Sequence, residues 1–232
     1  LVGAEYVRIK SWAKYLEWLR ALNTKDARER YDVVAIDTVD NLWDMVNHYV
    51  ADKWQEGVVG ERSDTWGQDW TELKKSWNDG LQLIQKAGFT PYFIGHSQQK
   101  TIEVPLSAEM QKDKESLEGY KEIQKGKDKY LEFLQYQPDL PEKAMNPINK
   151  MVDQILYMSD MVNSEGESER VIHTRGTHQW VAGSTFEHID PVVKLDPDSY
   201  KNALTDAINQ FDDSEQTDEK YHEPEEKQDF TV

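Results

Sequence analysis

The sequence predicts an α/β fold, in which a mostly parallel sheet is flanked by helices. Two short apolar segments, residues 32–37 and 92–95, carry the β-branched and aromatic side chains typical of buried strands. A helical pattern separates them, and polar side chains follow each segment at once. Parallel strands need a crossover connection, usually a helix, so this order indicates an open α/β sheet. Such sheets bind ligands at the carboxyl ends of their strands.

The first apolar segment, within "YDVVAIDTVD", ends abruptly in Asp37 and Thr38. We expect this strand to be buried on both faces, so that its backbone holds the carboxylate rigidly. Two interpretations are open: Asp37 serves a ligand at the sheet edge, or it caps the following helix, because Asp and Thr are good N-caps. His96 follows the second strand in the same way, and its alternative is a hydrogen-bonded structural histidine.

Helical periodicity predicts three helices in the first hundred residues. Residues 11–22 place apolar side chains on one face, with Ser11 as the N-cap. Residues 39–56 and 69–87 follow, and Gly88 suits the position just after the second of these. The aromatic side chains of residues 43–77 are expected in the core or a subunit interface, with base stacking as the alternative.

The second half of the chain is less regular. Residues 107–135, rich in Lys and Glu, read as a solvated insertion or helical excursion, interrupted by Gly119 and Gly126. A helix is expected from Asn146, with Pro147 at its first position, and a strand around residues 154–158. "ERVIHTR" and "HQWVAGS" alternate like the two strands of a late antiparallel hairpin, joined by Gly176-Thr177.

These patterns divide the chain into three parts. Residues 1–190 form the α/β core, and residues 191–211 contain a C-terminal helix capped by Asp196, with Tyr200, Leu204, Ile208 and Phe211 on one face. Residues 212–232 are strongly acidic and poor in apolar side chains, so we expect a disordered tail. That tail is solubilising, or it competes with DNA for a basic groove or recruits a replication partner.

Composition excludes several classes of protein. A formal net charge of -17 argues against coating nucleic acid by bulk electrostatics, so any DNA contact is local. The chain has no cysteine, which excludes disulfides and thiolate metal sites, and the six histidines lack the paired spacing of a zinc site. No apolar run approaches a bilayer span or a signal segment. We therefore expect a cytoplasmic protein without a membrane partner.

Several segments together resemble a family of phage nucleotide-binding proteins, which are reduced RecA-like P-loop ATPases. Several members of that family act in single-strand annealing or recombination. The resemblance covers roughly residues 5–190 and depends on the order of its motifs. These are "VVAIDTVDNL", "WGQDWTELKKSW", "PYFIGHSQQK", "LPEKAMNPINKMVDQILYM" and "HTRGTHQWVAGSTF".

The resemblance implies a RecA-like sheet that binds ATP and Mg²⁺. Asp37 is similar to the Walker B aspartate, which faces the metal through water, and Thr38 supports that shell. His96 is similar to the residue that senses the γ-phosphate, with Gln98 or Gln99 as further candidates. Arg175 is the remaining basic candidate in the late hairpin for reaching a neighbouring subunit's nucleotide, because relatives often have a basic residue near Thr185.

The chain departs from the family in its phosphate loop. No G-x-x-x-x-G-K-[ST] stretch occurs, and "EGVVGERSD", the nearest imitation, lacks the lysine. Too few residues precede Asp37 for a strand, phosphate loop, helix and second strand. We therefore expect that the N-terminal part of the fold is missing and that this fragment does not hydrolyse ATP unaided.

Two functions remain open at this stage. The first is a phage ATPase that assembles head to tail as a homo-oligomer and anneals or recombines single-stranded DNA, with the DNA-contacting loop at Lys100 and the insertion after it. The second is a non-catalytic interaction or regulatory protein of phage replication that has lost nucleotide binding. A fold alone does not choose between them.

Overall fold

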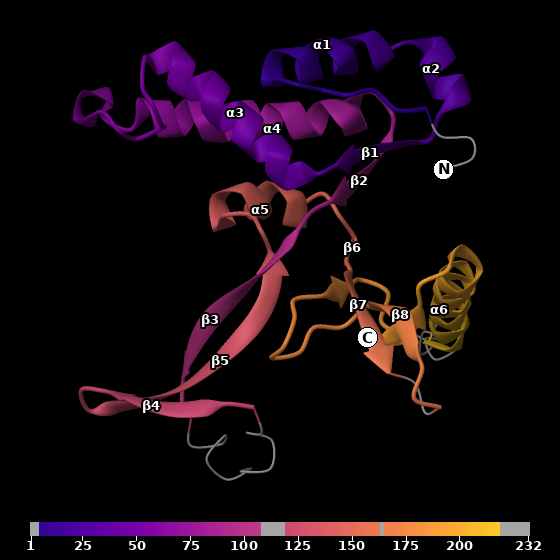
Figure 1. The fold of residues 1–232 in the computed structure, drawn as a ribbon. Helices are drawn as coiled ribbons and strands as arrows, with labels where there is room; N and C mark the ends of the chain where they lie inside the picture. Colours follow the sequence, from indigo (N-terminus) through magenta and orange to yellow (C-terminus); the bar gives the residue numbers. More distant parts are fainter. Residues whose placement is uncertain (1–4, 108–118, 163–164, 219–232) are drawn as a thin grey trace, which may run out of the picture. The chain divides into compact units, whose positions relative to one another are not determined.

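The computed structural model describes residues 5–107, 119–162 and 165–218, with side chains up to Gln210 (Figure 1). The chain forms two compact units. Unit 1 comprises residues 1–99 and 137–152, and unit 2 comprises residues 100–136 and 153–232. The chain leaves unit 1 after Gln99 and returns to it at Gln137.

Unit 1 contains a two-stranded parallel sheet and the helices that pack on it. Strand β1 (Val33–Asp37) pairs with β2 (Thr90–Ile94), and Asp37 lies opposite Ile94. The expected α/β class is present, but the described residues show two parallel strands and no larger parallel sheet. The helices of this unit are α1 (Trp12–Leu22), α2 (Lys25–Arg30), α3 (Val39–Trp54), the short 3₁₀ helix η1 (Ser63–Thr65), α4 (Gln68–Lys86) and α5 (Glu142–Asn149).

The three helices predicted in the first hundred residues are confirmed. Ser11 accepts a hydrogen bond from the backbone N–H of Lys14 and caps α1, as expected. Gly88 has a φ of +89°, the left-handed conformation that ends α4 at low cost. Their apolar faces meet in one core, where the ring centroid of Trp77 lies 5.3 Å from that of Trp43 and 6.1 Å from that of Trp12. The expectation that these aromatic residues build the core holds for Trp43 and Trp77.

Two details of unit 1 differ from expectation. Strand β1 is buried on one face only: Val34 is buried, whereas Val33 is 49% exposed, because within the described part of unit 1 no second layer covers the outer face of the pair. Helix α5 begins at Glu142, upstream of the predicted start, and includes Pro147 in its interior. The buried positions Ala144 and Ile148 explain this start, since they face the core one helical turn apart.

Unit 2 is built mainly from antiparallel strands. Strands β3 (Ser97–Pro105) and β5 (Asp128–Pro138), which run on from unit 1, form a sheet with β4 (Lys121–Lys125) in the order β3-β5-β4. A second sheet has the order β10-β8-β7, from β7 (Tyr157–Val162), β8 (Ser168–His173) and β10 (Val192–Lys194). Strands β6 (Gln154–Ile155) and β9 (Gly183–Ser184) form a short pair.

The helical excursion predicted for residues 107–135 is wrong where the structure describes it. Residues 121–138 form the hairpin β4–β5, with Gly126 at a φ of +64° in its turn. Lys and Glu favour helix, but burial of Leu131 and Phe133 and cross-strand pairs such as Lys121 with Glu132 override that propensity. Residues 108–118 lie outside the described residues.

The strand pairing predicted for the late antiparallel hairpin is also wrong. Strand β8 pairs with β7, which precedes it, and with β10, whereas Gly183–Ser184 pairs with β6. Gly166, at a φ of +83°, lies in the β7–β8 connection. The predicted strand at residues 154–158 is confirmed in β6 and the start of β7.

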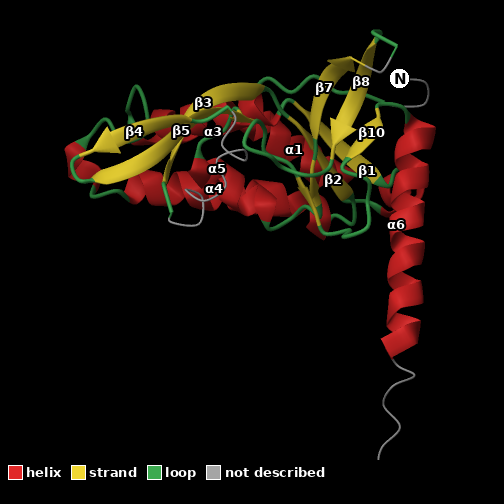
Figure 2. Ribbon diagram, turned by 90° about the horizontal axis from the view of Figure 1, so that it is seen from below, coloured by secondary structure: helices red, strands yellow, loops and turns green. Residues whose placement is uncertain are grey.

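Helix α6 (Pro197–Asp218) begins as predicted and continues past Phe211 (Figure 2). Asp196 accepts hydrogen bonds from the backbone N–H and the hydroxyl of Ser199, at 2.9 and 2.6 Å, and so caps the helix. Among the side chains of α6 described up to Gln210, Ala207 is buried, whereas Ile208 is 41% exposed, contrary to the predicted face. The expected disordered tail falls largely on residues 219–232, outside the described residues. Among the described helices, none has the length and apolar character needed to cross a bilayer.

The close contact of α1 and α4 at Gly80 gives a stability prediction. A Cβ atom at Gly80 would lie 2.4 Å from Cη2 of Trp12, whose ring is buried, and the hydroxyl of Tyr15 donates to the Gly80 carbonyl. Gly80→Ala should therefore destabilise the protein by about 1–3 kcal/mol, although the same change usually stabilises a helix.

Thermal unfolding measures this effect, with Asp79→Ala as the matched control at the neighbouring position of the same turn. The control should unfold near the wild-type temperature. An unfolding temperature of Gly80→Ala at or above that of the wild type would contradict the packing described here.

Candidate functional site

Asp37 and His96 come together at one edge of the two-stranded sheet. Asp37 is the last residue of β1, and His96 follows the end of β2 by two residues. The two strands are parallel and paired in register, so both side chains lie at the carboxyl edge, and the charge of Asp37 acts on the imidazole of His96. Neither side chain is buried, so this edge is open to a ligand.

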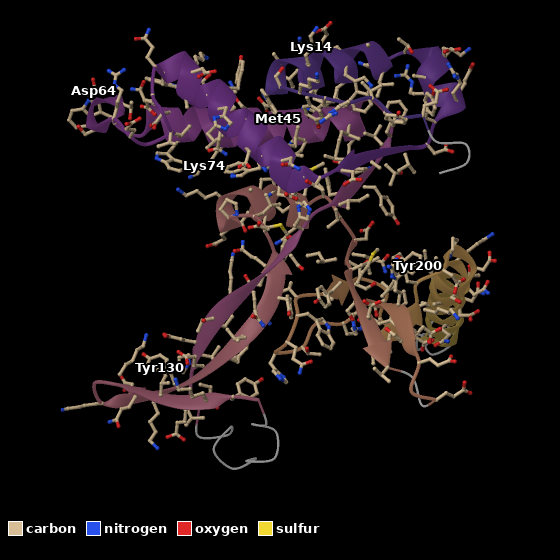
Figure 3. All side chains as sticks on the ribbon, in the orientation of Figure 1. Lys14, Met45, Asp64, Lys74, Tyr130 and Tyr200 are labelled. Carbon is tan, nitrogen blue, oxygen red and sulfur yellow. The ribbon has the colours of Figure 1, made fainter. Side chains whose placement is uncertain are left out.

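A second carboxylate, that of Asp40, holds His96 in place. Its Oδ2 lies 2.8 Å from Nδ1 of His96, and its Oδ1 accepts the backbone N–H of His96 at 3.2 Å. Asp40 belongs to α3, the helix on which Figure 3 labels Met45. Asp40 lies in the first turn of α3, and Gly95 lets β2 approach it closely, since a Cβ there would be 3.2 Å from Val39. The pairing directs Nε2 of the imidazole away from Asp40.

The ion pair shifts both pKa values in the direction that favours charge. The hydrogen bond that Nδ1 of His96 donates to the carboxylate of Asp40 raises the pKa of His96, and the nearby charges of Asp40, Asp139 and Asp37 add to this effect. Partial burial opposes ionisation of Asp40, but the hydrogen bonds from His96 and Thr38 outweigh it and lower the pKa of Asp40. His96 is thus protonated to a higher pH than a free histidine.

Thr38 occupies the N-cap position of α3, next to Asp37. Its side chain makes no capping hydrogen bond to the helix backbone, and its Oγ1 instead accepts from Nδ2 of Asn41 at 2.7 Å. Asp37 precedes the cap, and among the described residues no hydrogen bond or ion pair engages its carboxylate. The helix-capping alternative for Asp37 therefore has no support in this geometry.

Gln98, two residues after His96, is held by a hydrogen bond to Asp139. Its Nε2 donates to Oδ1 of Asp139 at 2.5 Å, and the backbone N–H of Asp139 donates to the carbonyl of His96 at 2.8 Å. The segment that returns to unit 1 thus braces the residues that follow β2. Gln99 is exposed beside them.

Arg175 belongs to unit 2, where its guanidinium binds three backbone carbonyls. Its donors lie 2.9 Å from the oxygen of Ser184, 2.7 Å from that of Phe186 and 2.6 Å from that of Glu187. These bonds hold the segment after β9 to the end of β8. Arg175 therefore has a local structural role within unit 2.

The glycine-containing loop between α3 and α4 is not arranged to bind phosphate. The N–H of Gly57 donates to Glu61 at 2.7 Å, and the N–H of Gly60 donates to Glu56 at 3.1 Å. Carboxylates therefore occupy the N–H groups that a phosphate-binding loop offers to its ligand. This agrees with the absence of the phosphate-loop lysine from the stretch.

The donor set at the sheet edge fits one weakly held hard cation beside an anion. Carboxylate oxygens are the ligands that Mg²⁺ prefers, and it keeps several of its waters, so a single exposed carboxylate such as Asp37 suffices for contact through water. Within the described ranges, no group of three or more His, Cys, Asp or Glu side chains is placed to hold a metal directly. The imidazolium of His96 complements a phosphate oxygen.

Sequence reasoning missed two residues of this edge. Asp40 carries a weak signal, since it follows Asp37 by three residues within "DTVD", but nothing in the sequence links it to His96. Asp139 is distant in sequence and reaches the edge only because residues 137–152 fold back into unit 1.

Comparison with known proteins agrees with this arrangement. A parallel strand pair packed on helices, with an acidic and a polar residue at its carboxyl edge, is consistent with a P-loop ATPase-like domain. The AAA domain family matches residues 1–186, and the chain belongs to this family. No solved structure matches it.

One curated relative is the SPbeta prophage-derived uncharacterized protein YorG of Bacillus subtilis (strain 168). It is 22% identical over 222 residues, which are 93% of this chain and 58% of the relative. The chain therefore spans a little over half the length of that relative.

The Asp40–His96 pair gives a prediction for pH titration. Asp40→Asn removes the main cause of the raised pKa, so the pKa of His96 should fall toward the free value of about 6.5. Because the pKa of His96 is higher in the folded than in the unfolded protein, its ion pair stabilises the fold fully at pH values below the unfolded-state pKa. This stabilisation is lost as the pH rises through the folded-state pKa. The variant should therefore lose stability mainly at acidic pH.

NMR titration of the imidazole signals measures the shift directly. His173 serves as the internal control, because burial lowers its pKa and its ring bonds Ser159 rather than Asp40. An unchanged titration of His96 in Asp40→Asn would show that the pair does not form in solution.

Proposed function

We propose that the edge formed by Asp37 and His96 is the Mg²⁺-ATP site of a phage RecA-like ATPase. The observation that carries the proposal is the placement of these two residues at the carboxyl ends of adjacent parallel strands. Asp37 would hold the metal through water, and Thr38 beside it would support that shell. Magnesium held there would supply positive charge to the phosphoryl group being transferred.

His96 acts as the γ-phosphate sensor in this proposal. Asp40 fixes its ring and raises its pKa, so the imidazolium presents its second nitrogen to the ligand side. Gln98, braced by Asp139, is the next candidate along the strand. To bind a neighbouring subunit's nucleotide, the guanidinium of Arg175 would have to release the three backbone carbonyls that it binds.

Hydrolysis requires a phosphate-binding lysine in addition to this edge. The 232 residues contain no G-x-x-x-x-G-K-[ST] stretch, so hydrolysis at this edge would need a phosphate loop from outside these residues. The coding sequence upstream of Leu1 is the quickest check. A phosphate-loop motif there supports the ATPase, and its absence favours the non-catalytic interaction protein.

Asp37→Asn in the full-length protein should reduce ATP turnover by about 100-fold, because the metal loses its anionic partner. The fold should be unaffected, since the side chain is exposed. Steady-state phosphate release measures turnover. Asp32→Asn is the matched control, because Asp32 precedes the opposite end of the same strand and should leave turnover unchanged. Wild-type turnover in Asp37→Asn would reject the metal assignment.

We further propose that the protein acts on single-stranded DNA in annealing or homologous recombination, as a head-to-tail homo-oligomer with a replication or single-strand-binding protein as a further partner. The resemblance to RecA-like phage proteins and the prophage origin of the relative support this. Lys100 on β3, which is half-buried, and Lys127 in the turn between β4 and β5 are the lysines that would contact the phosphate backbone. The neighbouring Lys121, Lys125 and Lys129 are paired with glutamates.

Replacement of both Lys100 and Lys127 by Ala should weaken binding of an oligothymidylate. It should also lower the slope of log affinity against log salt by about 0.7 for each phosphate that the protein no longer neutralises. Fluorescence anisotropy of a labelled strand measures both quantities, with Lys201→Ala on α6 as the control. An unaltered salt slope would show that other residues contact the DNA. Failure of the wild type to bind the strand would favour the non-catalytic interaction protein.

A further inference from the structure

Two buried carboxylates lie at the loop of residues 55–67, which carries Trp66 and joins α3 to α4. Glu56 follows the C-terminal end of α3 and is 8% exposed, and Asp69 lies in the first turn of α4 and is 0% exposed. Carboxylates are almost never buried to this degree unless they are paired or bind a cation. Each of these two side chains therefore needs partners that compensate its charge.

One oxygen of each carboxylate is satisfied locally. Oε2 of Glu56 accepts the backbone N–H of Gly60 at 3.1 Å, and Oδ1 of Asp69 accepts the hydroxyl of Thr65 at 2.9 Å. Burial raises the pKa of Asp69, but hydrogen bonds from backbone N–H groups and from Thr65 outweigh it, so the pKa is lowered. One of these N–H groups is that of Gly60, so the two carboxylates lie close to the same donor.

The other oxygen of each carboxylate has no partner. Oε1 of Glu56 and Oδ2 of Asp69 are both shielded from solvent, and neither has a hydrogen-bond partner among the described residues. A buried polar atom without a partner is costly, and more so on a charged group. Two carboxylates at one donor also repel each other. A ligand with positive charge would remove both penalties.

Arg62, the one cationic residue of this loop, is engaged elsewhere. Its Nε and Nη2 donate to Asp64 at 3.0 and 2.7 Å, and its Nη1 donates to the carbonyl of Trp54 at 3.0 Å. Figure 3 labels Asp64 on this loop. Although the charge of Glu56 acts on Arg62, the guanidinium is bonded to Asp64 and leaves the two buried oxygens without a partner.

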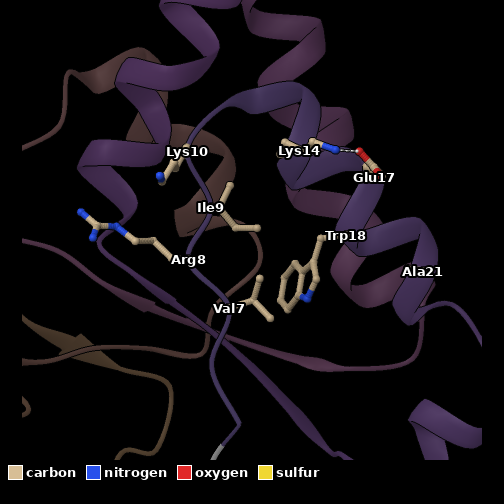
Figure 4. A pocket seen from close by; sticks show the side chains of 8 residues that line it. All are labelled: Val7, Arg8, Ile9, Lys10, Lys14, Glu17, Trp18 and Ala21. Carbon is tan, nitrogen blue, oxygen red and sulfur yellow. Dashed lines mark hydrogen bonds and ion pairs between the residues drawn. The ribbon is translucent and has the colours of Figure 1, made fainter.

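The charged side chains at the groove beside Trp18 differ in this respect. That groove lies between α1 and residues 7–10 (Figure 4). Lys14 lies 2.6 Å from Glu17 there, and both side chains are 66% exposed. An ion pair and water thus compensate the charges at the groove, whereas the two buried oxygens have neither within the described ranges.

We propose that Glu56 and Asp69 bind a calcium ion through Oε1 and Oδ2, and that this ion holds the loop between α3 and α4. A divalent cation neutralises both carboxylates and supplies the partner that both oxygens lack. Ca²⁺ accepts irregular geometry, whereas Mg²⁺ demands an octahedral shell and keeps several waters, so a site shielded from solvent favours Ca²⁺.

The remaining ligands of the ion come from other groups than carboxylates. Within the described residues, no group of three or more His, Cys, Asp or Glu side chains is placed to hold a metal, so backbone carbonyls and water that enters with the ion complete the shell. Asp37 lies before the first residue of α3 and Glu56 beyond its last, so this site is distinct from the sheet edge and does not depend on nucleotide binding.

Calcium titration of the full-length wild type, freed of metal with a chelator, is the first test. Calorimetry should show one site, and Ca²⁺ at about 100 times its Kd should raise the unfolding temperature by about 5–10 °C. Mg²⁺ should bind at least about 10-fold more weakly. The absence of both binding heat and a thermal shift at millimolar Ca²⁺ would overturn the proposal, and Mg²⁺ binding as tight as that of Ca²⁺ would overturn the assignment to calcium.

Glu56→Gln and Asp69→Asn distinguish a calcium ligand from a merely structural side chain. Each variant removes one charge but keeps an oxygen that accepts from Gly60 or Thr65. Without Ca²⁺ each should unfold at or above the wild-type temperature, because repulsion between the carboxylates is relieved. With Ca²⁺ each should unfold below the wild type and bind the ion at least about 10-fold more weakly. Lower unfolding temperatures in both conditions, with unchanged calcium affinity, would contradict the site.

Asp44→Asn is the matched control, because Asp44 is an exposed carboxylate of α3. It should leave calcium affinity unchanged, which excludes loose binding to the surface of a chain with a net charge of -17. Asp37→Asn should likewise retain calcium binding, so that loss of the proposed Mg²⁺-ATP site and loss of the calcium site are told apart. Equal weakening by Asp44→Asn and Glu56→Gln would reject the assignment of the ion to this loop.

Discussion

The parallel pairing of β1 with β2 is the constraint on which the candidate site depends. Hydrogen bonds between these strands bring Asp37 opposite Ile94, and so bring His96, which is distant from Asp37 in sequence, to the same edge. The pair is short, and its outer face is exposed, so its position comes from the helices on its inner face. Trp77, packed between Trp12 and Trp43, anchors those helices to one another.

A second link joins that core to the site from the other side. The indole N–H of Trp77 donates to the carbonyl of Ala144 at 3.0 Å, which fixes α5 against α4. The segment leading into α5 contains Asp139, and Asp139 bonds both Gln98 and the backbone of His96. The residues at the edge are thus held by elements whose own positions are set by burial of large apolar side chains. The buried core thus holds the side chains at the exposed edge in fixed positions.

The division of the chain into two units gives the protein two kinds of surface. Unit 1 carries the sheet edge, the loop of Trp66 and the groove beside Trp18, all on helices and short connections packed around one core. Unit 2 carries long antiparallel strands with paired charges, and the helix α6, in which Ala207 is buried among the side chains described up to Gln210.

Local sequence determined the elements whose signals are local. Ser11, Gly88 and Asp196 fixed helix ends through caps and a left-handed turn, and the apolar runs fixed β1 and β2. Tertiary structure decided what depends on distant partners: the hairpin β4–β5 in a segment rich in helix formers, the pairing of β8 with β7, and the ion pair of His96 with Asp40. Pattern and propensity describe one segment at a time, whereas strand pairing and ion pairs are chosen by which surfaces burial brings together.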